Sequence, residues 1–234
     1  MLNSTQLFLL ALAWLAYFII HSSIASIGLK KWVAKHHSNW MPAYRLGFNL
    51  VAILLLSGPL YLLYIFQGDP LWQWQGYQKV IANTLRFAAI AGFIWTLRYY
   101  DGSEILGTRQ LLQGEKSVED QERFHISPLH RYVRHPWYFL GMVYLWAGDM
   151  EPAWLVSCIM LSLYFIVGSR IEERKLETYH GDIYKHYAGA VPGLVPLPWR
   201  YLTQDEATTM MRNYRYTPDV GCDKRSASTK GFTK

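Results

Sequence analysis

The chain has 234 residues, of which 51% are hydrophobic, 16% aromatic and only 17% charged. Soluble domains carry about 25% charged residues, so this composition argues against an ordinary soluble protein. The formal charge of +6 does not indicate a nucleic-acid partner, because the cations fall in segments between apolar stretches. The two cysteines lie far apart, so neither a disulfide framework nor a metal site is expected.

Apolar stretches long enough to enter a membrane recur along the first 170 residues. Residues 7–29 contain no Asp, Glu, Lys or Arg and, at about 1.5 Å per residue, can cross a hydrocarbon core of roughly 30 Å. No Lys or Arg precedes this run, which favours a retained span over a signal peptide. Further membrane segments are predicted at 46–66, 85–99, 136–149 and 153–168. The last two are short and joined by "DMEP", so we expect a membrane-embedded hairpin.

These segments predict an all-α integral membrane protein with about five transmembrane helices, in a single domain covering residues 1–200. Lys and Arg are frequent in 30–45, in 109–134 and after Gly168, whereas "DMEP" has neither. By the positive-inside rule the cation-rich segments face the cytoplasm, with the N-terminus outside and the C-terminus inside.

The part of the chain that follows the last span is polar. Residues 170–189 are predicted to form a charged cytoplasmic helix, and the prolines of "VPGLVPLPW" would prevent it from continuing. Residues 201–234 are expected to be a polar tail, disordered over about its last dozen residues.

Two groups of polar residues lie where predicted spans meet the cytoplasm. In "HRYVRHPWYFLG", Arg134 and His135 precede a helix that Pro136 is suited to begin. A helix N-terminus beside cations favours an anionic group, although a positive-inside anchor explains the arginines equally well.

The second group, Glu172 and Glu173, directly follows an apolar stretch. Adjacent carboxylates at that depth require a cation, such as Arg134 or Arg170, or a ligand that donates hydrogen bonds. Together the two groups predict a cytoplasmic pocket suited to a zwitterionic, nucleoside-bearing cofactor.

The segments "RYVRHPWYFLG" and "EERKLETYHGDIYKHYAGAVP" resemble the C-terminal signature of the isoprenylcysteine carboxyl methyltransferase superfamily. "HSSIAS", "YRLGFNL", "GTRQL" and "LWAGDM" are similar to its bacterial branch, which holds methanethiol S-methyltransferases and NnrU-type proteins. The sequence departs from the family pattern at four places. Leu140 stands where glycine is usual, with Gly141 one position later; Pro128 and His130 replace Gly and Tyr; and His180 replaces Phe.

The resemblance implies a multi-pass methyltransferase of the bacterial inner membrane that uses S-adenosylmethionine. It implies that the matching residues line the cofactor pocket: Arg134, His135, Pro136, Tyr138, Glu172 and Glu173. Its partners would be membrane lipids and a small lipid-soluble thiol or lipid substrate, with methanethiol as the first candidate. Isoprenylcysteine carboxyl or phospholipid methylation is the alternative within this class. An NADPH-dependent membrane reductase and a non-catalytic membrane protein are the alternatives from other classes.

A thiol acceptor has to lose its proton, and nearby cations favour the thiolate. Four residues near the cytoplasmic ends of predicted spans are candidates for this catalytic role: His21, Arg45, Arg98 and Tyr100. His21 is the most suggestive, because an ionisable group inside a span is a functional candidate. The competing interpretation is a histidine that bonds a neighbouring carbonyl.

Overall fold

The computed structural model describes residues 3–116 and 125–216. Secondary structure in these ranges is helical apart from two isolated antiparallel bridges, Trp72 with Met150 and Leu197 with Arg200. The elements follow in the order α1 (Ser4–Ala25), α2 (Ile27–His36), η1 (Ser38–Trp40), α3 (Met41–Ile65), α4 (Gly76–Leu97), α5 (Gly102–Leu106), α6 (Thr108–Gln113), η2 (Leu129–Arg131), α7 (Pro136–Trp146), α8 (Pro152–His180), α9 (Asp182–Ala190) and α10 (Gln204–Tyr216).

Four helical segments among the described residues are long and apolar enough to cross a membrane: Ser4–Ala25, Ser38–Ile65, Gly76–Leu97 and Pro152–His180. Large apolar side chains on their outer faces are exposed, including Phe8, Ile19, Leu54 and Phe87, as expected for contact with lipid. The predicted all-α membrane class is therefore confirmed. The fifth predicted segment is α7, whose 11 residues rise only about 16 Å and cannot span a bilayer alone.

Helix boundaries differ from the predicted ones where capping residues intervene. The first span was expected at 7–29, but α1 begins after Asn3, which forms a capping box with Gln6, and ends at Ala25. Ser26 then accepts a hydrogen bond from the backbone of Leu29 and starts α2. The third span is longer than 85–99, because α4 begins at Gly76.

Helix α8 corrects the prediction of a separate cytoplasmic helix at 170–189. The chain is one continuous helix from Pro152 to His180, and it breaks only at Gly181, where φ is +57°. Hydropathy falls after Gly168, but a fall in hydropathy does not interrupt backbone hydrogen bonds, so the helix continues into polar surroundings. The first part of the polar tail also contains a helix, α10, while residues 217–234 lie outside the described residues.

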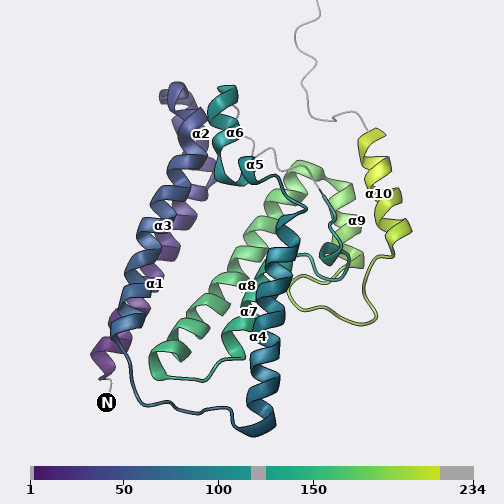
Figure 1. Ribbon diagram of the computed structural model, residues 1–234. Coiled ribbons are helices and arrows are strands. Elements are labelled where there is room, and N and C mark those ends of the chain that lie inside the picture. Colours follow the sequence, from purple (N-terminus) through teal and green to yellow (C-terminus); the bar gives the residue numbers. More distant parts are fainter. Residues whose placement is uncertain (1–2, 117–124, 217–234) are drawn as a thin grey trace, which may run out of the picture.

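Helix α1 lies beside α3 (Figure 1), and it packs against both α3 and α8 through a stripe of apolar residues. Leu10, Trp14 and Phe18 recur at every fourth position and are buried. The indole Nε1 of Trp14 donates to Ser157 Oγ on α8 at 3.0 Å, which fixes the register of the two helices. The same stripe continues to His21, one turn further along α1.

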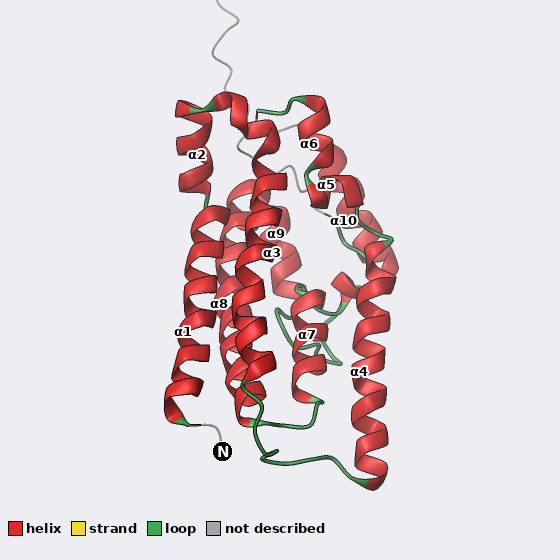
Figure 2. Cartoon of the chain, turned by 60° about the vertical axis from the view of Figure 1, so that its left-hand side comes forward, coloured by secondary structure: helices red, strands yellow, loops and turns green. Residues whose placement is uncertain are grey.

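Helix α7 lies between α4 and α8 (Figure 2). Trp137 Nε1 donates to Thr96 Oγ1 on α4 at 2.8 Å. Leu140, which replaces a family glycine, packs closely on Gly92, where a Cβ would meet its side chain at 3.3 Å. Gly141 in turn faces α8, because a Cβ on it would meet the ring of Phe165 at 3.2 Å. Leu140 and Gly141 therefore face different neighbours of this short helix, α4 and α8.

Helices α2, α5, α6, α9 and α10 gather at one end of the bundle, which we call the polar end (Figure 1). At the opposite end, the segments before α4 and before α8 are joined by the bridge between Trp72 and Met150. Asp149 there accepts a hydrogen bond from the backbone of Trp74 at 2.9 Å. This pairing joins the α7–α8 turn to the segment before α4, so that α4 and α8 both start from a fixed point.

Candidate active site

The N-terminal end of α7, the polar half of α8 and the segment after α9 meet at the polar end. Backbone pairing brings them together: Arg134 N donates to Pro192 O at 2.8 Å and His135 N donates to Gly193 O at 3.0 Å. Gly193 lies against the charged groups, because a Cβ there would meet Arg134 Nη2 at 3.3 Å and Glu173 Oε1 at 3.4 Å. The motif residues on α7 therefore reach those on α8, 38 positions later in the chain.

Four charged side chains form a compact group that we call the ion cluster: Arg134, His135, Glu172 and Glu173. Glu173 Oε1 accepts from Arg134 Nη2 at 2.7 Å, from Arg134 Nε at 2.9 Å and from His135 Nε2 at 3.0 Å. His135 Nδ1 lies 3.5 Å from Glu172 Oε2. Two carboxylates thus face one guanidinium and one imidazole, and the cluster is neutral when His135 is protonated.

The two carboxylates favour the protonated form of His135. Burial lowers the pKa of His135, but hydrogen bonds to Glu172 and Glu173 and their charges outweigh burial, so its pKa is raised above the usual value. Charged imidazole donates from both nitrogens, which fits the two carboxylates it touches. This stabilisation is fully present below about pH 6.5, the ordinary pKa, and is lost as the pH rises through the raised value.

Arg134 is fully engaged within the protein. Besides Glu173, its guanidinium donates to Ala188 O at 2.8 Å and to Val191 O at 2.5 Å, at the end of α9. Because helix C-termini leave carbonyls without intrahelical partners, this contact caps α9. The arrangement gives Arg134 a positioning role: it aims Glu173 and fastens α9 over the cluster.

Glu172 differs from Glu173 in being open to the outside. Its side chain is 43% exposed, against 24% for Glu173. One of its oxygens, Oε2, accepts from Tyr138 OH at 3.1 Å. The Tyr138 ring stacks between those of His135 and Phe165, at centroid distances of 5.3 Å and 4.9 Å. Glu172 is therefore the carboxylate of the cluster that a ligand can reach.

A cavity of about 270 Å³ opens beside Glu172, between α1 and α8, and we call it the α1–α8 cavity. It is lined by residues of α1, α7 and α8: His21, Ser22, Ala25, Tyr138, Tyr164, Gly168, Ile171, Glu172, Lys175, Leu176, Tyr179 and His180. Lys175 stands one turn beyond Glu172 and donates to Ala25 O at 3.4 Å. A carboxylate and an ammonium group thus share one cavity, which suits a zwitterionic ligand.

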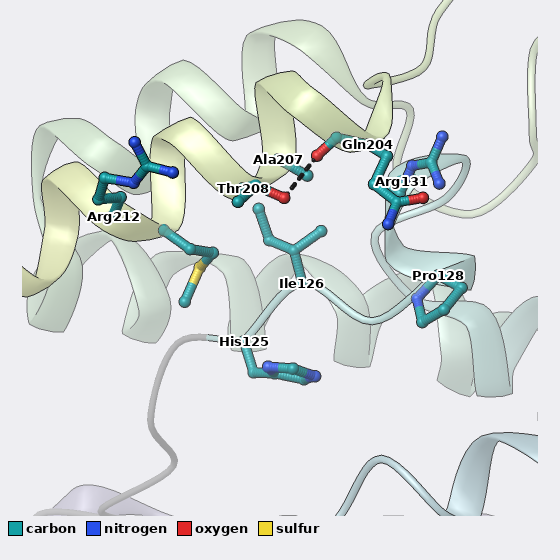
Figure 3. Close-up of a pocket in the computed structure, with 9 residues that line it drawn as sticks. His125, Ile126, Pro128, Arg131, Gln204, Ala207, Thr208 and Arg212 are labelled. Atoms are coloured by element: carbon teal, nitrogen blue, oxygen red, sulfur yellow. Dashed lines mark hydrogen bonds between the residues drawn. The ribbon is translucent and has the colours of Figure 1, made fainter.

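A second, larger cavity of about 520 Å³ lies between α10 and the segment preceding η2 (Figure 3). Ile126 and Thr208 face each other across it, with Arg131 and Arg212 at its two ends. No residue of the ion cluster lines it. The α1–α8 cavity is therefore the candidate site, because it contains Glu172 and Tyr138.

Comparison with known proteins agrees with the motif resemblance. Methanethiol S-methyltransferase 1 of Bradyrhizobium diazoefficiens is 30% identical over 210 residues, which cover 85% of this chain and 69% of that protein. The chain belongs to the methanethiol S-methyltransferase family. A methanethiol S-methyltransferase of Mycobacterium tuberculosis is 29% identical over 201 residues, covering 79% of this chain and 76% of that protein. No family model and no solved structure matches the chain.

Membership of the methanethiol S-methyltransferase family supports a membrane methyltransferase over the alternative of a nicotinamide-dependent reductase. Of the residues predicted for its cofactor pocket, the structure brings Arg134, His135, Tyr138, Glu172 and Glu173 together in and around the ion cluster. Pro136 begins α7 directly beside them. Their binding role remains a prediction.

The four predicted catalytic residues do not form one group in this family member. His21 lines the α1–α8 cavity. Arg45 Nε donates to Ile105 O at 3.2 Å, and the guanidinium of Arg98 lies over the Trp95 ring at 5.2 Å. Both side chains therefore have interaction partners away from the cavity. Tyr100 packs on Trp137 at 4.8 Å, next to α7 and α4. None of these three lines the α1–α8 cavity.

Sequence reasoning missed several residues of the cavity, among them Lys175 and Tyr164. Lys175 could have been found from its position one turn after Glu172, which places both on one helix face. Tyr164 could not, because its place depends on α1: its hydroxyl lies 3.3 Å from Ser22 Oγ and its ring stacks on Phe18 at 4.2 Å. These contacts join residues 142 and more positions apart in the chain.

Proposed function

We propose that this chain transfers the methyl group of S-adenosylmethionine to a small thiol, with methanethiol, the substrate named for its relatives, as the first candidate. The observation that carries the proposal is that Glu172, a member of the ion cluster, lines the α1–α8 cavity together with its hydrogen-bond partner Tyr138. Methylation of a prenylcysteine carboxylate or a phospholipid amine is the alternative for the same site.

The residues present fit this cofactor. Glu172 offers a carboxylate to the amino group of an amino-acid end, and Lys175 offers an ammonium to its carboxylate. The cavity volume, about 270 Å³, lies just below the usual range of about 300–1,000 Å³ for small-ligand pockets, and the rings of Tyr138, Tyr164 and Tyr179 line it. When bound, S-adenosylmethionine supplies a methyl group already activated by its sulfonium.

The protein's own contribution is to position the reactants and to exclude water. Arg134 and His135 hold the two glutamates, so that Glu172 keeps one orientation. Around His21, the rings of Tyr17, Phe48 and Tyr164 lie at centroid distances of 5.4, 4.9 and 6.3 Å. Such close packing supports a small acceptor over a prenyl chain, which would need a long apolar tunnel.

The test uses the whole protein purified in detergent. Isothermal titration should show binding of S-adenosylmethionine and none of NADPH. Labelled methyl transfer should then occur to methanethiol and fall as the thiol is lengthened. Binding of NADPH alone would contradict the methyltransferase, and transfer only to a prenylcysteine or a phospholipid amine would identify the alternative acceptor.

We further propose that the polar end faces the cytoplasm of a bacterial inner membrane. The segments 66–75 and 147–151 at the opposite end contain no Lys or Arg, whereas the polar end carries many. Alkaline phosphatase fused after residue 234 should be inactive in a bacterial host, and the same enzyme inserted within 66–75 should be active. The reverse result would overturn this orientation.

A further inference from the structure

His21 differs from the other titratable residues that line the α1–α8 cavity. Tyr164 meets Ser22, Lys175 donates to Ala25 O, and Glu172 accepts from Tyr138. Tyr179 and His180 also have partners. His21 is the one titratable group of this cavity, within the part of the chain the structure describes, whose side chain has no hydrogen-bond partner.

The two ring nitrogens of His21 lie in different surroundings. Nδ1 is buried without a partner, while Nε2 is not among the buried atoms that lack one. The rings of Tyr17 and Phe48 pack on the imidazole, and an aromatic face can accept a weak hydrogen bond from a buried N–H. A proton on Nδ1 then leaves the lone pair on Nε2, the nitrogen that a molecule in the cavity can reach.

Two other histidines of the chain have hydrogen-bond partners for a ring nitrogen. His36 Nδ1 lies 2.9 Å from Trp32 O, and His130 Nδ1 lies 2.7 Å from Ser127 Oγ. The alternative from the sequence, that His21 bonds a neighbouring carbonyl, is therefore not what the structure shows. An imidazole with an unused acceptor, in the same cavity as Glu172 and Tyr138, points to a proton-donating ligand.

We propose that His21 Nε2 takes the proton of the acceptor thiol, so that the thiolate forms inside the α1–α8 cavity. This inference rests on the proposed methyl transfer. The S–H bond breaks and its proton moves to Nε2. The thiolate sulfur forms a bond to the donor methyl carbon while the carbon–sulfonium bond breaks, and that electron pair stays on the donor sulfur. His21 afterwards returns its proton to water.

The test compares a thiol with a selenol, because methaneselenol is already ionised at neutral pH and needs no base. His21→Gln should lower kcat/KM for methanethiol at least about 100-fold, the usual contribution of a general base, and that for methaneselenol less than about 5-fold. His21→Asn should behave alike, and the exposed His36→Gln is the matched control. Equal losses with both acceptors, or no loss, would overturn the proposal.

Two measurements do not depend on turnover. The affinity for S-adenosylmethionine should stay within about 3-fold in His21→Gln, since donor binding is assigned to other residues. Diethyl pyrocarbonate should modify His21, mapped by mass spectrometry, and dimethyl sulfide should slow this reaction by occupying the cavity. An unreactive His21 beside a reactive His36 would contradict the proposal. A wild-type chain that fails to bind S-adenosylmethionine would instead overturn the proposed function, and this inference with it.

Discussion

Replacing Glu172 by glutamine is expected to weaken the binding of S-adenosylmethionine about 100-fold, which corresponds to about 2.7 kcal/mol. The reason is the loss of a charge-assisted hydrogen bond, worth about 1.5–3 kcal/mol, between the exposed carboxylate and an ammonium group. Glutamine keeps the shape and an acceptor for Tyr138, so the protein should remain folded. Isothermal titration in detergent measures the affinity, and circular dichroism checks the fold.

The control for this variant is Glu177→Gln on the same helix. Glu177 lies about one turn further along α8, where its one described partner is Lys185 at 3.6 Å, and it does not line the α1–α8 cavity. Its substitution should leave affinity unchanged within about 2-fold, because a surface ion pair contributes little. Equal affinity in Glu172→Gln and wild type would show that the donor binds elsewhere.

Replacing Arg134 by alanine is expected to remove donor binding and to destabilise the whole protein. Breaking a fully buried ion pair by removing one partner costs about 3–5 kcal/mol, and because this pair is only partly buried we expect a loss of about 2–3 kcal/mol. In a chain of this size such a loss lowers Tm by on the order of 10 °C. Arg134→Lys should recover only part of the lost stability, because one ammonium cannot reach Glu173, Ala188 O and Val191 O together.

The matched control is Arg200→Lys. Arg200 donates to Gly189 O and Ala188 O, so it contacts the same end of α9, but it pairs with no carboxylate of the ion cluster. Its substitution should lower Tm by less than about 3 °C and leave donor affinity unchanged. If Arg134→Ala had the same Tm and the same donor affinity as Arg200→Lys, the positioning role assigned to Arg134 would be wrong.

The membrane helices were predictable because hydropathy depends only on local composition. The segments that form α1, α3 and the first part of α8 are strongly hydrophobic. The C-terminal end of α8 and the presence of α10 were not predictable, because a polar helix differs little in composition from a polar loop. The grouping of Arg134 and His135 with Glu172 and Glu173 followed from their positions where predicted spans meet the cytoplasm, and the motif resemblance agreed with it. The contacts within that group could not be predicted, because they depend on how α7 packs against α8.

Long-range packing also decided which catalytic candidates lie in the cavity. Arg45 lies near the end of a span as expected, but the α5–α6 segment folds back over it. Gly107, with φ of +86°, lies so close that a Cβ there would fall 2.6 Å from Leu46 N. His21 was placed by its helical spacing from Trp14 and Phe18, a pattern visible in the sequence. Its missing hydrogen-bond partner depended on side chains from α3 and α8, which no local pattern gives.

The unbroken course of α8 links the position of the candidate active site to the thickness of the bilayer. At 1.5 Å per residue, Glu172 stands roughly 30 Å along the helix from Pro152, about the depth of a hydrocarbon core. A thicker membrane draws the two carboxylates toward hydrocarbon, and a thinner one lifts them into headgroups and water. Because α8 is continuous between its anchored turn and its glutamates, we expect lipid chain length to influence the charge state of the ion cluster.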